Sequence, residues 1–175
     1  TLIDSEIHTE EVVAELLNGY GFSAENLDYR PFYGVTWKAV ADLLLQEYPI
    51  LHGTDIESRL VERFDELGRQ TPPAFIPGAQ GALADVRSAH MKSAICTSGK
   101  REAVLDLQRR LAPAEALSDF VSAEAYQRSK PDPECYTLIA KRLEVSPHSI
   151  LVFEDSMAGM EAAKEAGMSV IAITH

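Results

Sequence analysis

The segment Ile150-Leu-Val-Phe-Glu-Asp-Ser-Met-Ala-Gly159 decides how this sequence folds. Its apolar start, residues 150–153, is typical of a buried strand, and the carboxylates of Glu154 and Asp155 follow directly. Apolar residues at helical spacing then continue over 158–166. The segment therefore predicts a strand, a short polar turn and a helix, with two carboxylates where the strand ends.

The same alternation repeats through the second half of the chain. Extended segments are expected at 93–97, 120–122, 150–154 and 169–174, and helices at 82–90, 101–111, 133–143 and 158–166. Alternating strands and helices predict an α/β fold with a parallel sheet covered by helices on both faces. In such a sheet, reactive groups lie at the carboxyl ends of the strands.

The first half of the chain has a different pattern. Apolar residues recur at helical spacing between residues 5 and 71, as in the stripe formed by Val40, Ala41 and Leu44, and no alternating strand pattern is present. Breakers follow at Thr71-Pro-Pro73 and Pro77-Gly78. We therefore expect a helical domain over 5–76 and an α/β domain over 77–175.

Composition limits the classes of partner. The chain has 175 residues, is 46% hydrophobic and carries a formal net charge of -11, which predicts a globular protein and argues against a nucleic-acid partner. Cys96 and Cys135 do not make a disulfide framework, which fits a reducing cytoplasm. We also expect no membrane association, because no apolar stretch has the length of a membrane span. The sequence is compatible with a monomer and indicates no other oligomeric state.

A second polar segment, Thr97-Ser98-Gly99, lies between the expected strand at 93–97 and the expected helix at 101–111. Hydroxyls and free backbone N–H groups at a helix N-terminus suit a phosphate, because the unsatisfied donors and the helix dipole both favour an anion. The structural alternative is an ordinary N-cap, where serine and threonine are common. Taken alone, the segment favours a cap.

A third polar segment, Ser129-Lys-Pro-Asp-Pro133, precedes the expected helix at 133–143. The prolines restrict the backbone and start the helix, so the ammonium of Lys130 is held in one direction. That favours a fixed positive charge in a site. A solvated loop lysine is an equally good interpretation of this segment alone.

The carboxylates of Glu154 and Asp155 indicate a metal site. Proteins hold Mg2+ through one or two carboxylates together with water and substrate phosphate. A glutamate buried at a strand end without a cation or a partner would be costly, which favours the metal interpretation. The alternative is that Asp155 and Ser156 cap the following helix.

In this order, the three segments resemble the second, third and fourth motifs of the haloacid dehalogenase superfamily, and within it the β-phosphoglucomutase-like phosphatase branch. Further residues agree with that resemblance: Pro77-Gly78, Phe120, Ser122, Gly159, Ala162, Ala163 and Gly167-Met168. The set is specific as an ordered whole, although each piece alone is weak. The resemblance implies an enzyme with a Rossmann-like parallel-sheet core and an inserted α-helical cap domain.

The family's roles carry over by position. They fall on Thr97, Ser98 and Gly99 for phosphate binding, on Lys130 for the cation that bridges nucleophile and phosphate, and on Glu154 and Asp155 for Mg2+. These groups would spread positive charge over oxygens that hold negative charge in a loose transition state. The implied substrate is a small phosphorylated metabolite.

The family's first motif runs Asp-x-Asp-Gly-Thr and often continues Leu-x-Asp-Ser-Glu. Thr1-Leu-Ile-Asp-Ser-Glu6 matches its end and continuation, so we expect the nucleophilic and acid/base aspartates to lie upstream of Thr1 in a longer native chain. Residues 1–4 would then be the remnant of the first core loop. Without that aspartate, the chain has no covalent acceptor and is expected to be inactive.

The helical half resembles the family's cap, which closes over the core and helps to select the substrate. Its segment 32–38 corresponds to the specificity loop, so Trp37 and Lys38 are predicted substrate contacts; the alternative for Trp37 is core packing. Mutase relatives place an arginine near Trp37 and a histidine near Thr9, and this sequence has neither at those positions. That difference favours a phosphatase over a mutase.

Three functions stay open on the sequence. The leading hypothesis is a Mg2+-dependent phosphatase that hydrolyses a sugar or polyol phosphate through an aspartyl-phosphate. The alternatives are a β-phosphoglucomutase-type phosphomutase and a non-catalytic phosphate-binding pseudo-enzyme. A dehalogenase is disfavoured, because paired carboxylates for a metal belong to phosphate chemistry.

Overall fold

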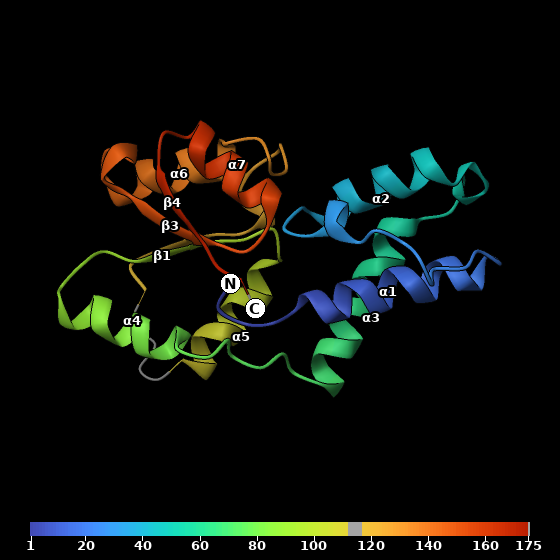
Figure 1. Cartoon of the computed structure of the whole chain (residues 1–175), viewed down its shortest axis with the longest axis horizontal. Helices are drawn as coiled ribbons and strands as arrows, with labels where there is room; N and C mark the ends of the chain where they lie inside the picture. Colours follow the sequence, from blue (N-terminus) through green and yellow to red (C-terminus); the bar gives the residue numbers. More distant parts are fainter. Residues whose placement is uncertain (112–116, 175) are drawn as a thin grey trace.

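A computed structural model describes residues 1–111 and 117–174. In Figure 1 the chain forms two lobes: a helical lobe containing α1, α2 and α3, and an α/β lobe containing the remaining labelled helices and the strands. Within the described residues, no helix is both long and apolar enough to cross a bilayer. The two lobes agree with the change in the sequence from a helical pattern to alternating strands and helices. The domain limits at residues 76 and 77 stay a prediction.

The helical lobe is built from α1 (Glu6–Gly19), α2 (Trp37–Glu47) and α3 (Ile56–Gln70), with short 3-10 turns at Arg30–Phe32 and Pro49–Leu51. Thr36 and Asp55 begin α2 and α3 by accepting hydrogen bonds from backbone N–H groups of the first turn. The apolar stripes of the helices meet in one core, whose largest fully buried side chains include Leu17, Leu44 and Leu60. Burial of each contributes about 1.5–3 kcal/mol, so this packing stabilises the lobe.

The α/β lobe follows the predicted alternation. Its elements are α4 (Ala79–Ser88), β1 (Ala94–Cys96), α5 (Arg101–Arg110), β2 (Asp119–Val121), α6 (Glu134–Leu143), β3 (Leu151–Glu154), α7 (Met157–Glu165) and β4 (Ser169–Ala172). Each lies within a few residues of its expected position. Part of the expected α/β range, 112–116 and 175, lies outside the described residues.

The strands pair in parallel, as predicted, but in two separate pairs. β1 pairs with β2 and β3 pairs with β4, so the described residues form two two-stranded sheets rather than one continuous sheet. Among the described residues, β1 and β3 are not hydrogen-bonded to each other, and no strand pairs with both. The α/β character and the parallel direction of the prediction are confirmed.

Strand β3 is less buried than its apolar sequence suggested. Leu151 and Phe153 are 51% and 49% exposed, whereas Glu154 is only 6% exposed. Successive side chains of a strand point to opposite faces, and only one face of β3 packs on the α/β core. The expectation of a fully buried strand was therefore wrong, because an apolar run does not specify how many faces are covered.

The two passages of the chain between the lobes run side by side. Ile3 and Phe75 form an antiparallel bridge, and backbone hydrogen bonds join Asp4 to Ala74 (2.9 Å) and Ile76 to Leu2 (3.0 Å). The chain thus enters and leaves the helical lobe at the same place, which is the topology of an inserted unit.

Candidate active site

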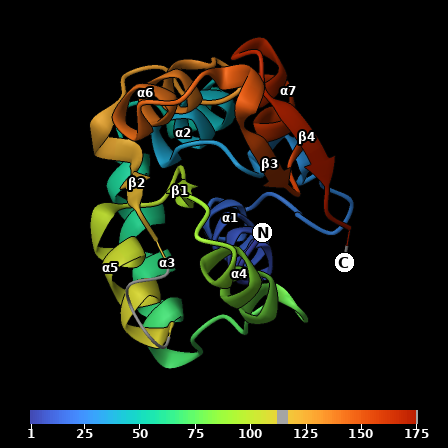
Figure 2. The same ribbon diagram turned by 90° about the vertical axis from the view of Figure 1, so that its left-hand side faces the viewer.

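The predicted site residues come together where the α/β lobe faces the helical lobe. Thr97 follows β1, Lys130 precedes α6, and Glu154 ends β3, so residues far apart in the sequence meet at one edge. In the figures, this edge of the α/β lobe lies toward α1 and the start of α2 (Figures 1 and 2). The predicted placement of reactive groups at the carboxyl ends of parallel strands is consistent with this geometry.

Lys130 is the centre of this arrangement. It is 4% exposed, and its Nζ donates to the Cys96 carbonyl oxygen (3.3 Å), the Tyr136 hydroxyl (3.3 Å) and Glu154 Oε1 (3.4 Å). Burial alone would lower the pKa of Lys130, but Tyr136 and Glu154 face the ammonium and hold that pKa above its ordinary value. The side chain is therefore a fixed positive charge, and the alternative of a solvated loop lysine is wrong.

Glu154 has a protein partner for its buried charge. Besides Lys130, Glu154 Oε1 accepts a hydrogen bond from the Ser156 hydroxyl at 2.6 Å. A buried ion pair is tolerated when additional hydrogen bonds satisfy its remaining groups, as they do here. The cost of burying Glu154 is thus met by Lys130 and Ser156, so burial of this side chain no longer argues for a metal by itself.

Asp155 faces the first residues of the chain. Its Oδ1 accepts a hydrogen bond from the Thr1 hydroxyl at 2.9 Å. The Asp155 side chain is 14% exposed, so its carboxylate is not completely shielded from solvent.

The capping alternative at this strand end applies to Ser156 alone. Ser156 is the N-cap of α7, and its hydroxyl oxygen accepts a hydrogen bond from the Gly159 N–H at 3.0 Å. Since the serine caps the helix, Asp155 is not needed for that role. The adjacent residues thus divide their functions, with Ser156 fixing the helix and Asp155 directed at Thr1.

The Thr97–Gly99 turn is also not a helix cap. Thr97 Oγ1 accepts from the Gly99 N–H (3.0 Å), whereas Lys100 occupies the N-cap position of α5 without a side-chain capping bond. The Arg101 N–H is instead bound by the carboxylate of Glu124 (3.0 and 3.2 Å). The sequence suggested that free N–H groups at the start of this helix could bind a phosphate. The Arg101 N–H is not free for that, because it donates to Glu124, 23 residues away.

Glu6 adds a carboxylate that sequence reasoning did not assign to the site. Burial, together with the negative charges of Asp155 and Glu154, raises its pKa to about 7. Glu6 begins α1, and its position in the first turn of a helix is so common for glutamate that it carried no signal. Carboxylates thus outnumber cationic side chains at this edge.

The predicted substrate contacts of the helical lobe have other partners. Trp37 packs on Phe64 of α3 with ring centroids 5.1 Å apart, which matches the core-packing alternative. Lys38 is exposed and pairs with Asp42 at 2.7 Å, one turn along the same helix. The contacts of both side chains belong to the helical lobe, and their role in substrate binding stays a prediction.

The segment that does reach the site is the turn before α2. Ser98 Oγ donates to the Gly34 carbonyl oxygen at 2.7 Å, and the Thr36 N–H donates to Ser129 Oγ at 2.9 Å. The expected specificity loop, residues 32–38, therefore contacts the α/β lobe through its backbone rather than through Trp37 or Lys38.

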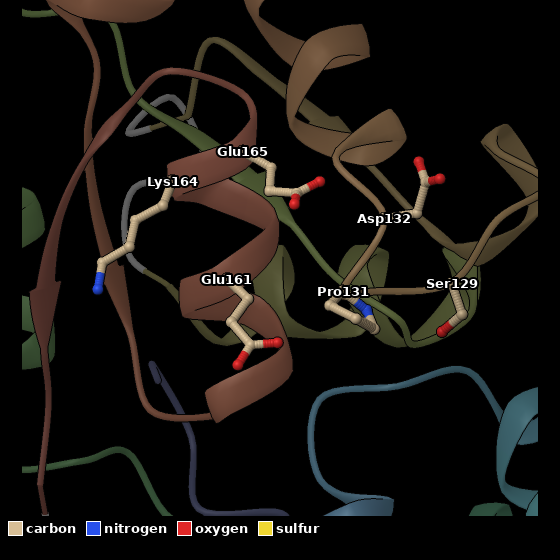
Figure 3. A pocket seen from close by; sticks show the side chains of 6 residues that line it. All are labelled: Ser129, Pro131, Asp132, Glu161, Lys164 and Glu165. Atoms are coloured by element: carbon tan, nitrogen blue, oxygen red, sulfur yellow. The ribbon is translucent and has the colours of Figure 1, made fainter.

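A surface hollow of about 530 Å³ lies on the outer side of the lysine loop. Figure 3 shows its lining residues, which are Ser129, Pro131, Asp132, Glu161, Lys164 and Glu165. Carboxylates outnumber the lysine there, so the hollow would repel a phosphate.

The chain's own side chains fit Mg2+ in a limited way. The described residues contain no cluster of three or more histidine, cysteine, aspartate or glutamate side chains that could hold a metal. Asp155 Oδ1 and Glu154 Oε2 both lie next to the Thr1 hydroxyl, at 2.9 and 3.4 Å, so the two carboxylates face the same point. One or two carboxylates suffice for a magnesium that also binds water and substrate phosphate, and these two residues supply that number.

Comparisons with known proteins agree with this architecture. The sequence model of the haloacid dehalogenase-like hydrolases matches residues 1–173. A phosphorylated carbohydrates phosphatase of Thermotoga maritima is 31% identical over 97% of this chain and 79% of its own length. A validoxylamine A 7'-phosphate phosphatase of Streptomyces hygroscopicus is 30% identical over 99% and 81%. The crystal structure of a β-phosphoglucomutase from Clostridium difficile superposes with a TM-score of 0.87, at 19% identity, and covers 100% of this chain and 81% of that one.

These observations define a class of hydrolase with a Rossmann-like α/β core and a helical lobe over its strand ends. The chain belongs to the haloacid dehalogenase-like hydrolase family. The resemblance to its β-phosphoglucomutase-like phosphatase branch, and the expectation of a hydrolytic enzyme, are confirmed.

Proposed function

We propose that this protein is a Mg2+-dependent phosphomonoesterase that hydrolyses a sugar or polyol phosphate. The observation that carries the proposal is the buried Lys130 ammonium, which joins the end of β1 to the end of β3 beside Asp155. The phosphatase relatives support phosphate as the group that is transferred, and a phosphorylated carbohydrate as the substrate class.

The chain's residues would act on the phosphate electrostatically. Lys130 would hold one positive charge at a fixed point, and the hydroxyl of Thr97 would donate to a phosphate oxygen. Because carboxylates outnumber cationic groups at this edge, a dianionic phosphate needs further positive charge. Mg2+ held by Asp155 and Glu154 would supply that charge when bound.

The covalent part of the proposal is an aspartyl-phosphate whose aspartate lies upstream of Thr1. Reading the codons directly before Thr1 in the gene tests it. An Asp-x-Asp pair there supports the covalent step, and its absence would overturn that step and favour the non-catalytic alternative.

Activity is tested in the longer native protein that includes the expected upstream aspartates, by phosphate release from a panel of sugar and polyol phosphates, with and without EDTA. Lys130→Ala and Asp155→Asn should each lower kcat by at least about a hundredfold, whereas the exposed controls Lys141→Ala and Asp106→Asn should not. Migration of phosphate within a hexose phosphate, without release, would identify a mutase instead. Full turnover in EDTA would exclude the metal.

A further inference from the structure

Each loop that carries predicted reactive groups also has a serine. These are Ser98, itself predicted to bind phosphate, beside Thr97; Ser129 beside Lys130; and Ser156, the N-cap of α7, beside Asp155. All these serines contact one short segment of the helical lobe, residues 34–36. A single turn of the helical lobe therefore touches every loop of the candidate site.

Two of the contacts are hydrogen bonds and one is a close approach. Ser98 Oγ donates to the Gly34 carbonyl oxygen at 2.7 Å, and the Thr36 N–H donates to Ser129 Oγ at 2.9 Å. Figure 3 shows the Ser129 hydroxyl at the side of its loop that faces the neighbouring segment of the helical lobe. Gly34 has a φ of +71°, and a Cβ there would lie 2.0 Å from Ser156 Oγ. Only glycine fits at this position.

The helical lobe uses backbone atoms for all of these contacts. The Gly34 carbonyl, the Thr36 N–H and the Gly34 Cα do not depend on the side chains of the segment. The side chains of Tyr33 and Trp37 are engaged elsewhere, with Glu10 and Phe64 respectively. Docking of residues 34–36 therefore does not depend on the side chains of Tyr33 and Trp37.

The serines connect the docked segment to the reactive residues. Tyr126 donates to Ser98 Oγ and to the Thr97 carbonyl oxygen, both at 3.2 Å, so the Ser98 hydroxyl is part of the hydrogen-bond network of the Thr97 turn. Ser129 is covalently adjacent to Lys130, whose ammonium is the central charge of the site. Movement of residues 34–36 would therefore disturb the loops of both reactive groups.

We infer that Ser98 and Ser129 are positioning residues that couple docking of residues 34–36 to the placement of Thr97 and Lys130. The inference rests on the proposed function, because it concerns how the same site is completed. Phosphate binds tightly only when the helical lobe is docked, and the lobe docks more firmly when phosphate is bound.

Hydrogen exchange of the Thr36 amide, measured by NMR, tests the docking itself. Ser129→Ala removes the acceptor of this N–H and should accelerate its exchange by up to about tenfold, because one hydrogen bond is lost. Ser129→Thr keeps the acceptor and should restore slow exchange. Ser88→Ala, an exposed serine of α4, is the matched control. Unchanged exchange in Ser129→Ala would overturn the inference.

Gly34→Ala tests the close approach without touching the α/β lobe. It should accelerate Thr36 exchange by at least about tenfold, because the new Cβ overlaps Ser156. Gly21→Ala is the control, since Gly21 has a similar φ of +83° but a Cβ there would meet no heavy atom within 4 Å. If the two variants accelerated Thr36 exchange equally, the acceleration would come from backbone strain, and the inference would be overturned.

Inorganic phosphate with Mg2+ is the probe for the coupling. It should slow Thr36 exchange in the unaltered protein, and its affinity should fall about tenfold in Ser98→Ala and in Ser129→Ala. Faster Thr36 exchange with unchanged phosphate affinity would overturn the coupling. Phosphate-dependent protection of Thr36, combined with no phosphate release from any substrate by the longer native protein with its upstream aspartates, would refute the proposed function and leave the coupling standing.

Discussion

The two lobes bury different kinds of side chain. The core of the helical lobe consists of large apolar residues, such as Leu17, Leu44 and Leu60. The core of the α/β lobe contains small or polar residues, such as Ala162 and Tyr136, and the ion pair of Lys130 with Glu154 lies beside it. One lobe thus uses its interior for packing, whereas the other accepts buried charge in order to hold a reactive group in place.

Breaking the Lys130–Glu154 ion pair should have the largest effect, and it tests whether the α/β lobe depends on paired buried charge. Glu154→Gln should destabilise the protein by about 3–5 kcal/mol, because the charge of Lys130 is left buried without its counter-charge. Urea unfolding measures this loss. The double variant Lys130→Met/Glu154→Gln should recover a large part of it. Equal losses in the single and double variants would mean that the pair does not act as a unit.

A glycine substitution tests how closely the α/β interior is fitted around Glu154. A Cβ at Gly159 in α7 would lie 1.7 Å from Glu154 Oε1, so Gly159→Ala should cost about 1–3 kcal/mol. The control is Gly81→Ala in α4, where a Cβ meets nothing within 4 Å and the higher helix propensity of alanine should add about 0.5–1 kcal/mol. Thermal unfolding of the two variants should therefore shift in opposite directions.

The smallest effect concerns a surface contact of the helical lobe. Arg63 of α3 donates to both carboxylate oxygens of Glu15 in α1 (2.6 and 2.9 Å), and these hydrogen bonds lower the pKa of Glu15 below its ordinary value of 4.5. A lowered folded-state pKa contributes stability above pH 4.5, and that contribution is lost as the pH falls through the folded-state pKa.

Glu15→Gln should therefore cost about 0.5 kcal/mol or less at pH 7, because the pair is exposed and screened by solvent, and less than that at pH 3. Urea unfolding at the two pH values measures this difference. Glu25→Gln, in an exposed turn, is the control and should be neutral at both. A cost at pH 3 as large as that at pH 7 would show that packing, not charge, joins α1 to α3 here.

The order of elements and the parallel pairing could be predicted because each depends on local pattern. The apolar stripe of α2 predicted that Val40, Ala41 and Leu44 are buried, and they are. The exposure of Phe153 could not be predicted in this way, because it depends on which elements pack against β3. Apolar sequence shows what a residue prefers, but tertiary structure decides whether that preference is met.

The candidate site shows the same limit. Lys130, Glu154 and Asp155 were predicted as site residues, but the direct contact between Glu154 and Lys130, 24 residues away, was not. The hydrogen bond from the first N–H of α5, that of Arg101, to Glu124 was missed for the same reason, since 23 residues separate the two. Contacts of this kind depend on the fold as a whole, and a pattern of neighbouring residues carries no signal for them.

The paired passages between the lobes restrict how the helical lobe can move. A lobe tethered by one strand of chain has many rotational degrees of freedom, whereas a hydrogen-bonded ribbon at residues 2–4 and 74–76 leaves mainly a swing about one axis. The helical lobe therefore stays at a high effective concentration over the strand ends. Because little conformational entropy is lost on closing, a few backbone contacts around Gly34 suffice to hold it there.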